Sequence, residues 1–66
     1  MLVRFDDWEV VRGQRAEVRL AGKTVCTGIV GAVIDHGRTV WIQPFLGPRR
    51  AFAKEDSYEI WAAVRD

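Results

Sequence analysis

The chain has very few of the residues that build most catalytic and metal centres. Its 66 residues include a single cysteine, Cys26, and a single histidine, His36. One cysteine excludes an intrachain disulfide and a cysteine-based zinc cluster, which fits a reducing compartment. No apolar run approaches the roughly 18 residues that a membrane-crossing helix needs, and residues 1–10 carry acidic side chains where a secretory signal would be apolar. We therefore expect a cytoplasmic protein with no membrane partner.

The lone cysteine and the lone histidine are also too far apart in the expected fold to act together. A nucleophile and its base must lie within hydrogen-bond reach, whereas ten residues of extended strand separate their ends by roughly 30 Å. The acidic residues at 6–9 and 55–56 lack the spacing of a calcium loop. The sequence therefore predicts no catalytic residue, no metal site and no cofactor.

The chain is short for a protein that folds without help. A domain of this length buries only about 60% of the surface that its unfolded chain exposes, so its core is thin. A hydrophobic content of 48% nevertheless argues against disorder. We expect residues 1–66 to form one domain, for which self-association would be a common source of extra stability.

The net charge of +1 conceals an uneven distribution. Residues 18–54 hold six basic residues and one acidic residue, a net charge of +5. Residues 1–17 have a net charge of −1, and residues 55–66 have a net charge of −3. A basic middle between acidic ends predicts a basic face, unless the two ends fold against that face and neutralise it.

Residue patterns predict a series of short strands. Apolar and charged residues alternate strictly over residues 15–20, which is the period of a half-buried strand. A tight turn at 21–23 leads into residues 24–34, where β-branched side chains favour a strand. Gly28 and Gly31 inside this stretch indicate a bend or a bulge, which a strand needs when it serves both sides of a small barrel.

The second half of the chain continues this pattern. The glycine turn at 35–37 is a strong hairpin signal, and Gly47-Pro48 ends the strand that follows, because proline cannot donate to a ladder. A polar turn at 54–57 allows a single turn of tight helix. The strands predicted around these turns cover residues 38–45, 50–54 and 58–64.

The first fourteen residues allow two interpretations. Asp6 followed by Glu9 is a possible capping box, and Gly13 would end a short helix there. Alternatively, residues 9–11 form a strand that pairs with residues 16–18 across a turn. We favour the extended form, and we treat residues 1–13 as an amino-terminal extension of the fold.

Five short strands joined by tight turns form a meander that should curl into a small barrel. Residues 13–18 resemble the opening strand of SH3-like barrels, and residues 18–23 and 27–30 with Asp35 are similar to the first Sm motif. The same stretch resembles the SH3-like carboxy-terminal domain of biotin-protein ligases. The resemblance implies an all-β, five-stranded SH3-like barrel over residues 14–64, or an Sm-like barrel with a short amino-terminal helix. The chain contains no asparagine to supply the RNA-contacting residue of Sm proteins, so the resemblance implies the fold and not the ligand.

Three aromatic residues are candidates for a partner-binding surface. Trp41 and Phe45 lie on the face of their strand opposite Val40 and Ile42, and Trp61 alternates away from its apolar neighbours. Exposed tryptophan near arginine is typical of a binding surface. The alternative is a second small core, in which Trp41 and Trp61 pack on each other or beneath the amino-terminal segment with Trp8 and Phe5.

Basic residues in the turns are candidates for nucleic-acid contacts. Arg49 and Arg50 follow Pro48, and with Lys23, Arg38 and Lys54 they would line one end of a barrel and contact phosphates. The alternative is a set of solvated loops whose charges protect an edge strand from aggregation.

These observations leave three hypotheses for function. The first is a non-catalytic binding or assembly module, in which Trp41, Phe45 and Trp61 contact a protein partner or a second copy of the chain. The second is a barrel that binds RNA or single-stranded DNA through Lys23, Arg38, Arg49 and Arg50. The third is an oligomeric enzyme with a shared pore, because the chain is similar in size and strand pattern to the plasmid-encoded dihydrofolate reductases. We favour the first, and we expect the chain alone not to be an enzyme.

Overall fold

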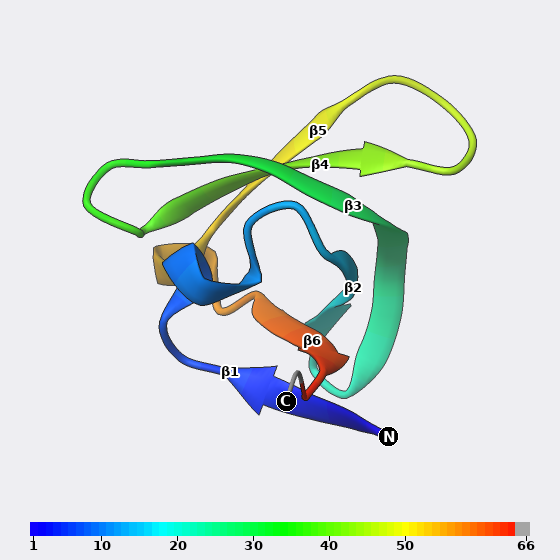
Figure 1. Cartoon of the computed structure of the whole chain (residues 1–66), viewed down its shortest axis with the longest axis horizontal. Helices are drawn as coiled ribbons and strands as arrows, with labels where there is room; N and C mark the ends of the chain where they lie inside the picture. Colours follow the sequence, from blue (N-terminus) through cyan, green and yellow to red (C-terminus); the bar gives the residue numbers. More distant parts are fainter. Residues whose placement is uncertain (65–66) are drawn as a thin grey trace.

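Six antiparallel strands form one sheet in the computed structural model, which describes residues 1–64 (Figure 1). The strands are β1 (Leu2–Phe5), β2 (Arg15–Leu20), β3 (Lys23–Ile34), β4 (Thr39–Pro44), β5 (Arg50–Ala53) and β6 (Glu59–Ala63), and two short 3-10 turns are η1 (Trp8–Val11) and η2 (Lys54–Asp56). The sheet order is β1-β6-β2-β3-β4-β5. The predicted all-β fold is confirmed. The closed five-stranded barrel is not confirmed, because there are six strands and no ladder within residues 1–64 joins β1 to β5.

The long strand β3 bends, and this bend folds the sheet over itself (Figure 1). Its first half pairs with β2, and its second half pairs with β4 from Gly28 onward. The register with β4 shifts between Val30 and Val33, on either side of Gly31, so the predicted bend is confirmed. A Cβ atom on Gly28 would lie 2.1 Å from the carbonyl oxygen of Gln43, so only glycine allows β4 to approach this closely.

One core lies between the two halves of the folded sheet. Alternate residues of the central strands point into it, and Val18, Val40, Ile42 and Ile60 are fully buried. Burial of each such side chain contributes about 1.5–3 kcal/mol. Trp8 of η1 is 2% exposed and belongs to the same core. The alternation had separated two faces on β4 and β6 without choosing between them, and the inward face is the one that carries Val40 and Ile42 on β4 and Ile60 and Ala62 on β6.

The first thirteen residues are an integral part of the fold. β1 pairs with β6 along the edge of the sheet, and η1 supplies Trp8 and Val11 to the core. The strand that we favoured for residues 9–11 is therefore wrong, and a short helical turn is present instead.

The predicted cap of this turn was off by one residue. Asp7, not Asp6, is the cap, and its Oδ1 accepts a hydrogen bond of 3.0 Å from the Glu9 backbone N–H. Asp6 instead forms an exposed ion pair with Arg4, at 3.6 Å from Nε to Oδ1. Gly13 follows the turn with a φ of +80°, in agreement with the predicted stop.

Candidate functional site

An apolar hollow of about 330 Å³ lies beside the loop that joins β4 to β5. We call it the loop groove, and it is lined by Val25, Cys26, Thr27, Pro44, Phe45, Leu46, Pro48 and Arg50. Phe45 is 55% exposed and Leu46 is 91% exposed. The lining contains no carboxylate. Phe45 and Leu46 are adjacent in the chain and both line the hollow, and contiguous exposed apolar surface of this kind is typical of a contact surface.

The groove forms because β4 stops early. Pro44 ends β4 opposite Gly28, and the Phe45 backbone N–H then makes a last, long hydrogen bond of 3.4 Å to the Thr27 carbonyl oxygen. From there the chain turns away through Gly47-Pro48 and returns as β5, which pairs only with β4. On the side away from β2, the first residues of β3 therefore face the loop, because the pairing with β4 begins only at Gly28.

Three arginines near this loop lie over aromatic rings. The guanidinium carbon lies 4.9 Å from the ring centre of Phe45 for Arg15, 5.3 Å from that of Trp41 for Arg49, and 5.0 Å from that of Phe52 for Arg50. None of the three forms an ion pair with a carboxylate of residues 1–64. The rings position the planar cations, and N–H groups of Arg15 and Arg49 stay available to an anionic group. Arg50 Nη1 donates a hydrogen bond of 3.3 Å to the Val25 carbonyl oxygen.

The structure brings together only part of the predicted basic set. Arg49 and Arg50 lie in and after the β4–β5 loop, and Lys23 begins β3, two residues before Val25 of the groove. Arg38 follows the other end of β3, where its carbonyl oxygen accepts a hydrogen bond of 2.8 Å from the backbone N–H of Lys54. The five cations therefore do not line one end of the fold.

The three aromatic residues predicted to form one partner-binding surface also lie in two separate places. Trp41 and Phe45 lie near the groove, and each has an arginine over its ring. Trp61 lies on β6, where Arg19 covers its ring at 4.3 Å and its indole N–H donates to Glu59 at 3.0 Å. Trp61 is therefore already engaged within the protein.

A polar network surrounds Trp61 on the outer face of β6 and β2. Glu17 Oε1 accepts hydrogen bonds from the Thr24 hydroxyl at 3.0 Å and from Arg19 at 3.1 Å. The Thr24 hydroxyl and Arg19 lower the pKa of Glu17, with the hydroxyl as the larger cause. The hydrogen bond from Trp61 likewise lowers the pKa of Glu59. Both carboxylates are thus held in their charged form by the sheet itself.

The alternative of a second small core, in which Trp41 and Trp61 pack on each other or with Trp8 and Phe5, is wrong. Trp8 joins the main core, and Phe5 packs against that core. Trp41 and Trp61 are half-buried, each beneath its own arginine.

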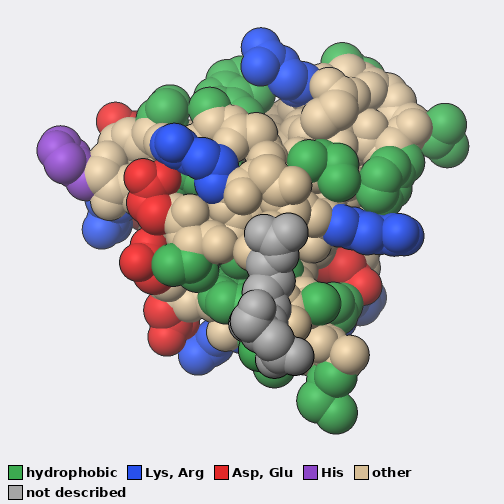
Figure 2. Space-filling view, viewed as in Figure 1, with side chains coloured by type: hydrophobic (Ala, Val, Ile, Leu, Met, Phe, Trp, Pro, Cys, Tyr) green, Lys and Arg blue, Asp and Glu red, His purple; other side chains and the backbone are tan. Residues whose placement is uncertain are grey.

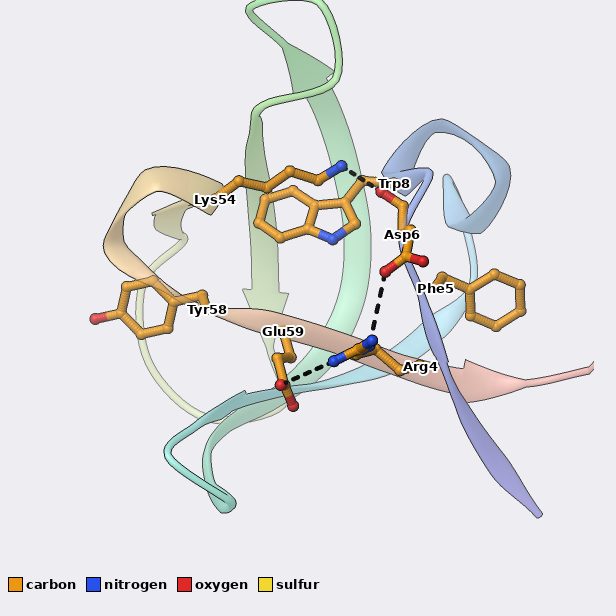
Figure 3. A pocket seen from close by; sticks show the side chains of 7 residues that line it. All are labelled: Arg4, Phe5, Asp6, Trp8, Lys54, Tyr58 and Glu59. Atoms are coloured by element: carbon orange, nitrogen blue, oxygen red, sulfur yellow. Dashed lines mark hydrogen bonds and ion pairs between the residues drawn. The ribbon is translucent and has the colours of Figure 1, made fainter.

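A second hollow, of about 300 Å³, lies between β1, η1, η2 and β6 (Figure 3). Its charged groups bind one another: Arg4 pairs with Asp6 and with Glu59, and Lys54 Nζ donates to the Asp6 carbonyl oxygen above the Trp8 ring. These contacts attach the amino-terminal segment to η2 and β6. We assign this hollow a structural role, because its charged side chains already have partners.

The charged side chains are distributed unevenly over the surface. Figure 2 shows acidic side chains gathered on the side where η1 and η2 lie, with exposed hydrophobic side chains on the opposite side. Within residues 1–64, no carboxylate of the acidic ends lines the loop groove.

The remaining chemistry-bearing residues do not form a centre. Within residues 1–64, no group of three or more His, Cys, Asp and Glu side chains is placed to hold a metal ion. Cys26 is buried at the base of the groove, whereas His36 is exposed in the turn between β3 and β4. No helix in the described part of the chain is long and apolar enough to cross a membrane.

Sequence reasoning missed Arg15, Val25 and Leu46 as parts of the site. A usable signal was present, because Phe45 and Leu46 are two large apolar residues in a loop between Pro44 and Pro48. Two consecutive large apolar residues in a surface loop cannot both pack into the core, so their presence there predicts an exposed apolar surface.

No protein-family model matches the chain, and neither a curated protein nor a solved structure matches it. The resemblance to SH3-like and Sm-like barrels therefore stays a prediction.

Proposed function

We propose that this protein is a non-catalytic binding module that holds a protein partner in the loop groove. The exposure of Phe45 and Leu46 beside an apolar hollow is the observation that carries this proposal. Full burial of each side chain by a partner would contribute about 1.5–3 kcal/mol. Leu46 and Val25 are aliphatic, and aliphatic side chains favour a protein partner because they cannot stack with bases.

The charges around the groove support an acidic partner. Arg15 and Arg50 border the apolar surface, and no acidic side chain lines it. Arginine and aromatic residues at the centre of a contact are the residue types that most often dominate binding energy. Complementary charge would also raise the association rate.

A peptide selection tests this proposal. A library of random twelve-residue peptides is displayed and selected on the immobilised protein, and the affinities of the enriched peptides are measured by fluorescence anisotropy. We expect the double variant Phe45→Ser, Leu46→Ser to weaken these peptides at least tenfold, because it removes the exposed apolar pair.

The matched control is Ile34→Ser, which removes an exposed aliphatic side chain at the other end of β3. We expect this variant to leave the affinities unchanged. The proposal fails if no peptide is enriched, or if the enriched peptides bind the double variant as well as they bind the native protein.

A second candidate function is binding of RNA or single-stranded DNA. The observation in its favour is the set of three arginines, Arg15, Arg49 and Arg50, that lie over aromatic rings without a carboxylate partner in residues 1–64. Guanidinium groups bind phosphates well, and Phe45 offers an exposed ring on which a base can stack.

Titration of a labelled twelve-residue oligonucleotide at two salt concentrations tests this candidate. We expect the affinity to fall steeply between about 50 and 200 mM salt, because the logarithm of the binding constant decreases linearly with the logarithm of the salt concentration, with a slope roughly proportional to the number of phosphates contacted. The double variant Arg49→Ala, Arg50→Ala should lose most of the affinity, whereas Arg38→Ala should not. Binding that does not depend on salt would exclude this candidate.

A further inference from the structure

Besides the outer edges of the sheet at β1 and β5, the first residues of β3 also form an unpaired edge. β2 pairs with β3 from Lys23 to Ile29, but the pairing of β4 with β3 begins only at Gly28. Lys23, Thr24 and Cys26 therefore have partners in β2, whereas Val25 is the extra residue of a bulge in that pairing. Within residues 1–64, no ladder runs along the other side of residues 23–26. We call residues 23–26 the open edge.

A side chain takes the place of the missing strand. The Arg50 Nη1 donates a hydrogen bond of 3.3 Å to the Val25 carbonyl oxygen. Val25 is the extra residue of a bulge between Thr24 and Cys26 in the pairing with β2, so the Arg50 bond, and not strand alternation, shows that its carbonyl oxygen faces the β4–β5 side. The Thr27 carbonyl oxygen accepts the Phe45 N–H on the same side of β3. The Val25 carbonyl therefore points where an added strand would lie.

The hydrogen bond from Arg50 to Val25 is weak enough to be displaced by a partner. The bond between Arg50 and Val25 is exposed and long, so a backbone N–H from a partner could replace it at little cost. Charged side chains beside an unpaired edge also protect it from indiscriminate pairing. Release of the Val25 oxygen would free the Arg50 guanidinium to bind an acidic group.

The open edge and the loop groove are continuous. Val25, Cys26 and Thr27 belong to the lining of the groove, together with Phe45 and Leu46 across from them. An extended peptide along the edge points every second side chain toward one face, so one bulky apolar side chain would enter the groove. Lys23 at the start of the edge and Arg50 beside it would meet acidic side chains in flanking positions.

We propose that the partner is an extended, acidic segment of another protein that adds to β3 as a strand along the open edge. It places a bulky apolar side chain in the loop groove and a carboxylate on Arg50. This inference rests on the proposed protein-binding function and specifies its geometry. Strand addition is a recurrent mode of peptide recognition, in which the backbone supplies affinity and alternate side chains supply specificity.

Single backbone N-methylation of an enriched twelve-residue peptide tests the geometry, because each methyl group removes one N–H without changing a side chain. We expect at least tenfold losses of affinity at alternate positions and small losses between them. Replacement of the peptide's acidic residues by their amides should weaken binding at least threefold. Backbone NOEs between the peptide and residues 23–27 should show the pattern of adjacent strands.

The outcomes separate this inference from the proposed function. If N-methylation has no effect at any position while the Phe45→Ser, Leu46→Ser variant still loses binding, strand addition is wrong and the groove function stands. If amide replacement has no effect, the acidic partner is wrong. If light scattering without peptide shows a dimer that the peptide dissociates, the native occupant is a second copy of this chain and the choice of another protein is overturned.

Discussion

The Arg19 guanidinium carbon lies 4.3 Å from the ring centre of Trp61, and this contact joins β2 to β6 on the outer face of the sheet. The same guanidinium donates to Glu17, whereas the indole donates to Glu59. Glu59 in turn accepts a hydrogen bond of 3.3 Å from Arg4 of the edge strand β1. The network therefore connects three adjacent strands and stabilises the sheet, which is why we exclude Trp61 from the proposed binding surface.

Arg19→Ala should lower the free energy of unfolding by about 1 kcal/mol, because it removes a partly buried cation–π contact and a half-buried ion pair. Urea denaturation followed by tryptophan fluorescence measures this change. The control is Arg38→Ala, an exposed residue for which we expect a change of less than about 0.5 kcal/mol. Equal effects of the two substitutions would show that the network contributes nothing.

Stability should fall at acidic pH because of the two carboxylates in this network. The pKa of Glu17 is lowered by the hydrogen bond from Thr24 and by Arg19, and the pKa of Glu59 is lowered by the hydrogen bond from Trp61. A folded-state pKa below the unfolded one gives stability that is complete above the ordinary value of 4.5 and is lost as the pH falls further.

Urea denaturation at a series of pH values between 7 and 2.5 measures this dependence. The double variant Glu17→Gln, Glu59→Gln should be less stable at pH 7 and should lose less stability on acidification. The explanation is wrong if the native protein and the variant respond to acid in parallel.

Much of the fold could be predicted because one-sided burial leaves a pattern in the sequence. Strict alternation over Arg15–Leu20 predicted the bounds of β2 that the structure shows. The glycines within β3 predicted the irregularity in its pairing with β4. β1 was missed because four residues at an edge are too short to establish a period. The turn η1 was ambiguous because the capping pattern of Asp6 and Glu9 favours a short helix, whereas the apolar residues within 9–11 equally suit a strand that pairs with residues 16–18.

The candidate site was less predictable than the fold. The loop groove depends on where β4 stops relative to β3, which is a property of register and not of any one segment. Arg15 contacts Phe45 although thirty positions separate them in the sequence. The five predicted basic residues do not meet at one end for a related reason, since Lys23 begins β3 and Arg38 lies in the turn beyond the other end of that long strand.

Ala21→Asn should raise the free energy of unfolding by about 1 kcal/mol, because Ala21 has a φ of +52° and non-glycine residues other than Asn and Asp rarely adopt this conformation. Asn followed by glycine is also the preferred pair for a two-residue hairpin turn. In a domain of this size, the midpoint of thermal unfolding should rise by roughly 4–8 °C. Ala32→Asn, at an exposed strand position, should not raise it. A rise with both variants would point to solubility rather than to the turn.

Gly28→Ala should lower the free energy of unfolding by about 3 kcal/mol, at the upper end of the range for an overpacked site. The added methyl group would lie 2.1 Å from the Gln43 carbonyl oxygen, and that backbone atom cannot move without breaking the pairing of β3 with β4. The matched control is Gly31→Ala, where the nearest atom is the Trp41 carbonyl oxygen at 3.4 Å. We expect the control to cost less than about 1 kcal/mol. Because Gly28 also sets where β4 ends, Gly28→Ala should weaken the selected peptides as well, whereas Gly31→Ala should leave them bound. Equal destabilisation by the two substitutions would mean that the close approach of β4 does not position the groove.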